Sequence, residues 1–149
     1  MNPAAGLAIF LVICGGGMLA LQAPTNAMLA RAGGSPVLAA LISFAVGTIA
    51  LFLVWLVSAN RPNSAQFVAL PWYAWLGGLY GAFFVAVAAY GAPRIGLAPL
   101  ITISIAGQIA MALWLDQIGA LGLPREPINP GRIFGALLVV AGVILVRRN

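Results

Sequence analysis

Long apolar runs separated by short polar stretches organise the chain. Each run is roughly twenty residues long and apolar on all sides, as expected of a helix that crosses a hydrocarbon core of about 30 Å. A membrane barrel would instead need alternating segments of about ten residues. The pattern therefore predicts an all-α integral membrane protein with five transmembrane helices in a single domain, residues 1–149. We expect these helices at about residues 3–30, 36–58, 72–90, 95–118 and 131–147.

Turn and cap signals lie between the runs. Ser35 and Pro36 place an N-cap residue and a first-turn proline ahead of the second helix, and Asn2 and Pro3 repeat that signal at the first. A short break is expected at Gly91–Gly96, ahead of the fourth helix.

A polar patch, LQAPTNAML from Leu21, follows directly on the first apolar run. Gln22 and Asn26 are four residues apart and share one helix face, and Pro24 between them removes a backbone donor and favours a kink. One interpretation is a transporter helix that opens toward a cavity. The other is that the patch marks the end of the span, because the residues before it already cover most of the core.

The amino-acid composition narrows the class of protein further. The chain is 63% hydrophobic and 6% charged, with a mean hydropathy of +1.09, whereas soluble domains are about a quarter charged. It contains no histidine, one cysteine (Cys14) and two acids (Asp116 and Glu126), so neither a metal site nor a nucleophile–base pair is indicated. We expect no enzyme activity, no cofactor and no nucleic-acid partner. Because Arg31 is the first charge, the N-terminal run is predicted to be a retained helix and not a secretion signal.

The arginines show almost no bias between the two membrane faces. Five spans place Arg61, Arg125 and Arg132 on the N-terminal side, against Arg31, Arg94, Arg147 and Arg148 on the other. Since positive charge near span ends sets orientation, three against four favours insertion in both orientations. The alternative is that local context or a partner fixes one topology. All four tryptophans (Trp55, Trp72, Trp75 and Trp114) fall on the N-terminal side, and an oppositely inserted pair would supply them to both faces.

Four uncharged polar side chains are predicted near mid-depth, in addition to the two amides of the polar patch: Thr48, Tyr80, Ser104 and Gln108. Such groups line substrate sites in transporters or serve as interhelical hydrogen bonds. We take the following as candidate substrate-binding residues: Gln22, Asn26, Tyr80, Gln108, Ser104 and Thr48. For Thr48 and Ser104 the interhelical role is favoured, because a hydroxyl can bond to the backbone one turn earlier. Asp116 follows Trp114 near an interface, so an interfacial or packing role is favoured over proton coupling.

The last helix carries Gly131, Gly135 and Gly142 on one stripe. Small residues at this spacing favour close packing, either inside the protomer or against a second copy.

The closing segment GRIFGALLVVAGVILV from Gly131, together with Asp116-Gln117 ahead of it, resembles the last part of the transporter repeat of the drug/metabolite transporter superfamily. GQIAMALWLDQIG from Gly107 and LQAPTNAML are similar to its half-size five-helix branch, EamA-like bacterial inner-membrane proteins of unknown function. The resemblance implies one unit of an inverted-repeat 5+5 transporter fold, so that half-size chains pair. Unlike the small multidrug-resistance branch, the first run has no glutamate, so proton-coupled export of cationic drugs is not implied.

Together these features predict a multi-pass protein of the bacterial cytoplasmic membrane. We expect an antiparallel homodimer that transports a small neutral or amphipathic metabolite by alternating access. The alternative is a non-transporting scaffold that packs against a larger membrane partner. Substrate, direction and coupling ion are not encoded in any motif of the sequence.

Overall fold

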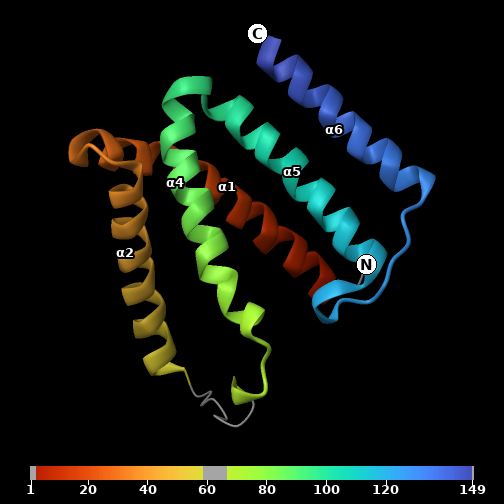
Figure 1. Cartoon of the computed structure of the whole chain (residues 1–149), viewed down its shortest axis with the longest axis horizontal. Coiled ribbons are helices and arrows are strands. Elements are labelled where there is room, and N and C mark those ends of the chain that lie inside the picture. The colour runs from red at the N-terminus through yellow and green to blue at the C-terminus, as the bar shows by residue number, and fades with distance from the viewer. Residues whose placement is uncertain (1–2, 59–66, 149) are drawn as a thin grey trace. The chain divides into compact units, whose positions relative to one another are not determined.

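The computed structural model describes residues 3–58 and 67–148, and the elements it contains are all helical (Figure 1). In chain order they are α1 (Pro3–Gly33), α2 (Pro36–Val57), the 3₁₀ helix η1 (Trp72–Leu76), α4 (Gly77–Ile95), α5 (Leu97–Ile118), the 3₁₀ turn η2 (Ala120–Gly122) and α6 (Pro130–Arg148). Within residues 3–58 and 67–148, four stretches are long and apolar enough to cross a membrane, and α6 adds a shorter apolar helix. The predicted all-α integral membrane class is confirmed. The expected cap at Asn2 lies outside the described residues.

The chain divides into two compact units, residues 1–94 and 95–149. The first holds α1, α2 and most of α4, and the second holds α5 and α6.

Helix α1 continues through the polar patch. It spans 31 residues, about 46 Å, and carries Pro24 in its interior. A proline leaves the carbonyl four residues earlier without its usual donor. Nearby, the Thr25 hydroxyl donates to the carbonyl oxygens of Leu21, at 3.1 Å, and Gln22, at 2.9 Å. The patch therefore does not end the helix, which reaches Gly33.

The turn between α1 and α2 forms as the cap signal predicts. Gly34 has φ +70°, the left-handed conformation that closes many helices. Ser35 then adopts an extended conformation, and its Oγ accepts a hydrogen bond from the Leu38 amide at 3.2 Å, with Pro36 in the first turn of α2. This cap is confirmed, and it brings the end of α1 beside the start of α2.

Helix α4 extends five residues past the expected end at Tyr90. Pro93 is accommodated inside the last turns, and Arg94 Nη1 donates to the Tyr90 carbonyl oxygen at 2.6 Å. Side-chain donors of this kind satisfy carbonyls at helix ends. The break is thus confined to Gly96, with φ +85°, between α4 and α5.

The core of the first unit is built from small side chains. Its most buried residues are Ala23, Asn26 and Ala27 on α1, Ala39 and Ala40 on α2, and Val85, Ala88 and Ala89 on α4. Alanine and glycine let helix backbones approach closely. At Gly81 on α4, a Cβ would lie 3.1 Å from Phe44 Cζ of α2, whereas Gly77 and Gly78 have nothing within 4 Å of that position.

In the second unit α5 packs against α6. Gly119 ends α5 with φ +63°, where a Cβ would meet Arg125 Cβ at 3.1 Å, so glycine is required for both reasons. Asn129 begins α6 by accepting a hydrogen bond from the Arg132 amide on its Oδ1, at 2.9 Å.

Candidate functional site

Asn26 is the only polar residue among the buried residues that the structure describes, with 3% of its surface exposed. It lies on the face of α1 that also buries Ala23 and Ala27. Gln22, one turn earlier, is half-buried. The two amides thus flank Pro24 within one continuous helix. Polar side chains in an apolar span are costly unless they serve packing or a ligand.

The other four candidate residues lie elsewhere. Thr48 on α2 is exposed, and Tyr80 on α4 is 62% exposed. In the second unit, Gln108 is exposed, and half-buried Ser104 donates its hydroxyl to the Ile101 carbonyl oxygen at 2.8 Å. Within the first unit, the structure brings Gln22 and Asn26 together and leaves Thr48 and Tyr80 on other helices. A cavity shared by the six residues stays a prediction.

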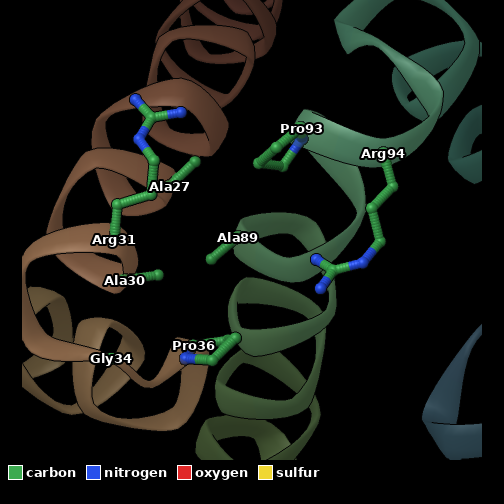
Figure 2. Close-up of a pocket in the computed structure, with 8 residues that line it drawn as sticks. All are labelled: Ala27, Ala30, Arg31, Gly34, Pro36, Ala89, Pro93 and Arg94. Carbon is green, nitrogen blue, oxygen red and sulfur yellow. The ribbon is translucent and has the colours of Figure 1, made fainter.

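A cavity of about 480 Å³ lies in the first unit, where the ends of α1 and α4 meet the start of α2. Its lining residues are Ala27, Ala30, Arg31, Gly34, Pro36, Ala89, Pro93 and Arg94. Figure 2 shows the methyl groups of Ala27 and Ala30 facing Ala89 across it, with Pro36 and Pro93 on either side. Small apolar side chains therefore form the walls between α1 and α4.

Arginines lie on two sides of this cavity. Arg31 lies in the last turn of α1 and Arg94 in the last turn of α4. The Arg94 guanidinium turns away from α1 in Figure 2 and lies over the Tyr90 ring, with Cζ 3.6 Å from the ring centroid. This cavity was not predicted from the sequence, because alanines and prolines carry no chemical signal. The available clue was that Arg31 and Arg94 end spans on the same predicted membrane face.

The two acids of the chain share one arginine. Arg132 Nη1 lies 3.1 Å from Asp116 Oδ2, and its Nη2 pairs with Glu126 Oε2. The connection is fixed further by backbone bonds, since the Glu126 amide donates to the Asp116 carbonyl oxygen at 2.8 Å. Gln117 adds two more contacts, accepting from Arg125 Nε and from the Ile128 amide. Asp116 thus joins α5, the connecting segment and α6, as a structural role requires.

The glycine stripe of α6 finds no close neighbour. A Cβ at Gly135 or Gly142 would meet nothing within 4 Å, and one at Gly131 would meet only the Asn129 side chain, at 3.3 Å. The role of this stripe in packing against a second copy stays a prediction.

Comparisons with known proteins address the chain as a whole. Residues 7–145 match the family described as "Putative inner membrane exporter, YdcZ". The inner membrane protein YdcZ of Escherichia coli (strain K12) is 31% identical over 151 residues, an alignment that covers 100% of this chain and 99% of the relative. No solved structure matches the chain.

These matches agree with the helices described above. A relative from the inner membrane and several membrane-length helices identify a multi-pass inner membrane protein, and an exporter family indicates transport rather than catalysis. Because the family match spans nearly the whole chain, the protein belongs to the YdcZ family of inner membrane proteins.

Proposed function

We propose that the protein transports a small neutral or amphipathic metabolite by alternating access, as an antiparallel homodimer. The observation that carries this proposal is the burial of Asn26 beside Pro24 in a helix of membrane length. An amide offers four hydrogen-bonding positions, so placing it among alanines is costly without a function. Gln22 supplies a second amide one turn away, which is enough to orient a polar group of a substrate.

Pro24 provides the movement that alternating access needs. Its missing N–H weakens the helix at one point, and helix kinks are commonest at prolines. The Thr25 hydroxyl donates to the carbonyl oxygens of Leu21 and Gln22, so these two carbonyls keep a donor when the helix bends, whereas the Ala20 carbonyl is the one that lacks the Pro24 N–H. Transporters of inverted-repeat construction place their sites beside helices that are broken near the midplane, and in the proposed mechanism a continuous α1 that bends at Pro24 serves the same purpose.

The proposed dimer rests on the size of the five-helix chain. The described part of the chain has five apolar helices, and the superfamily that the sequence resembles builds transporters from two such units in inverted orientation. The near balance of arginines lets one sequence supply both orientations. Large exposed side chains along α1, among them Phe10, Val12 and Ile13, are available to contact lipid or a second copy.

The rival function is a membrane scaffold with a larger partner. The transporter and the scaffold hypotheses predict different behaviour of the purified protein without a partner. Protein reconstituted into liposomes should accelerate the flux of at least one solute in a panel of neutral and amphipathic fluorescent dyes, and Asn26→Leu should abolish that flux. Absence of flux for the whole panel, together with a larger membrane protein that co-purifies stoichiometrically, would favour the scaffold. Leu21→Ala on the exposed side of α1 serves as a matched control.

A further inference from the structure

A stretch of exposed apolar side chains precedes α4 in the first unit. Trp72 and Trp75 are 75% and 62% exposed, although tryptophan is a large apolar residue that is highly buried on average. The sequence has no charged residue between Arg61 and Arg94, so no charge in the stretch favours contact with bulk water. An exposed apolar patch of this kind marks a surface that another component covers. Its large exposed side chains are Phe67, Val68, Leu70, Trp72, Tyr73 and Trp75.

The stretch folds back on itself at Pro71 and does not continue the axis of α4. Pro71 is extended, with φ −66° and ψ 150°, and it separates η1 from the preceding turn, in which the Leu70 amide donates to the Phe67 carbonyl oxygen at 3.2 Å. The rings of Phe67 and Trp75 then meet across Pro71, with their centroids 6.0 Å apart. Residues 67–76 therefore form one local structure, which we call the aromatic turn.

Helix lengths place the aromatic turn at the edge of the hydrocarbon core. Helix α4 has 19 residues, about 28 Å, so it nearly crosses a core of about 30 Å without η1. In the last turn of α2, the Trp55 ring lies 6.0 Å from the Phe52 ring. Gly81 of α4 lies against Phe44 of α2, and Figure 1 shows the end of α2 and the start of α4 at the same end of the first unit. Two helices thus bring aromatic side chains to one level, as in the aromatic belts of membrane proteins.

We infer that the aromatic turn is an interfacial anchor, and that its partner is membrane lipid at the boundary between headgroups and acyl chains. Tryptophan and tyrosine fit this boundary because the ring is apolar, while the indole N–H and the phenol O–H can bond to headgroups and water. Bulk water would leave the rings uncovered, and the hydrocarbon core would leave the N–H and O–H groups without partners. Aromatic anchors of this kind set the depth and tilt of the helix to which they are attached, here α4. The anchor does not depend on transport, so its test is independent of the proposed function.

Depth-dependent fluorescence quenching of the full chain in liposomes tests the inference. Trp72 or Trp75 is kept as the single tryptophan, and the other three are replaced by phenylalanine. Phosphatidylcholine brominated near the headgroup end of its acyl chains should quench either residue about twofold more strongly than phosphatidylcholine brominated near the chain ends. Because the brominated lipids occupy both leaflets, the comparison holds for either orientation of the chain.

Phe83→Trp, in a chain whose native tryptophans are all replaced by phenylalanine, is the matched control. Phe83 is 72% exposed on α4 and lies about 9 Å along the helix from Gly77, so it should show the opposite ranking of the two lipids. Thermal unfolding reports whether each variant is folded. If the phenylalanine background does not fold, Trp72→Cys and Phe83→Cys in a Cys14→Ala chain, labelled with an environment-sensitive dye, give the same comparison.

Any other ranking at Trp72 and Trp75 would overturn the inference. Stronger quenching by bromine near the chain ends would place the aromatic turn inside the membrane span. Quenching by aqueous acrylamide, with none by either lipid, would place it in water. No quenching by any of these reagents would show that a second copy or another part of the chain covers it.

Discussion

Arg132 on α6 lies 3.1 Å from Asp116 on α5, so one ion pair joins the two helices of the second unit. Glu126 pairs with the same guanidinium, which makes Arg132 the common partner of both acids in the chain. The side chains are about one third exposed, at 30% for Arg132 and 34% for Asp116. Water competes with pairs of this exposure, so their contribution to stability is small.

The first prediction concerns this network. Asp116→Asn removes one pair and should lower the free energy of unfolding by at most about 1 kcal/mol, as for other exposed ion pairs. Arg132→Leu leaves two carboxylates side by side without a counter-charge and should cost more. Thermal unfolding in detergent ranks the variants, with Arg125→Gln as a control that keeps both acid pairs. Equal losses for Asp116→Asn and Arg132→Leu would contradict the shared role of Arg132.

The second prediction concerns close packing between α2 and α4. Alanine is a better helix former than glycine by about 1 kcal/mol, so Gly78→Ala, with open space around it, should be neutral or stabilising. At Gly81 the new methyl group meets Phe44 at 3.1 Å, and the ring has to move. Gly81→Ala should therefore be the less stable of the two variants. The same stability for both would show that α2 and α4 do not meet at this position.

The third prediction concerns the glycine stripe of α6. A Cβ at position 135 would meet nothing within 4 Å, so we expect Gly135→Leu to change helix association chiefly where another surface lies against α6. We expect a lower dimer fraction in detergent and in bilayers, because the side chain separates the backbones. Leu137→Ala, on a different part of the helix surface, is the control. Unchanged dimer content would remove the stripe from the dimer interface.

The fourth prediction concerns orientation. With arginines split three against four, reporters active only in the cytoplasm or only in the periplasm should both give signal when fused after Asn149. Moving one or two arginines from one set of connections to the other should then fix a single orientation. Signal from one reporter alone in the unmodified chain would rule out dual insertion.

Particular residues show what the sequence could predict. The start of α2 was predictable because Ser35 and Pro36 act locally, through one hydrogen bond and a fixed φ. The end of α4 was not, because Arg94 supplies a side-chain donor to the Tyr90 carbonyl and the helix tolerates Pro93. Gln22 and Asn26 were visible as candidates because amides are rare in apolar spans. Asn26 is more buried than Gln22 because of the face of α1 that packs against the other helices, and only the tertiary structure shows which face this is.

The cavity beside Arg31 and Arg94 was hidden for the same reason. Its walls are alanine and proline side chains from three helices, and each of these residues is unremarkable in its own segment. Asp116 was placed near an interface by its position after Trp114, but its partner Arg132 is sixteen residues away and required the fold.

Thiol accessibility is the most direct test of whether Asn26 faces a water-filled transport cavity. In a Cys14→Ala background, Asn26→Cys and Leu21→Cys are compared in membranes with a small water-soluble thiol reagent. Leu21 is 68% exposed on the surface of the chain, whereas Asn26 is only 3% exposed. If the surface at Leu21 faces lipid and the interior at Asn26 is hydrated, the reagent reaches position 26 more readily than position 21. The cysteine at position 26 should react much faster than the one at position 21. No reaction at position 26 in folded protein would contradict it and favour a dry, scaffolding bundle.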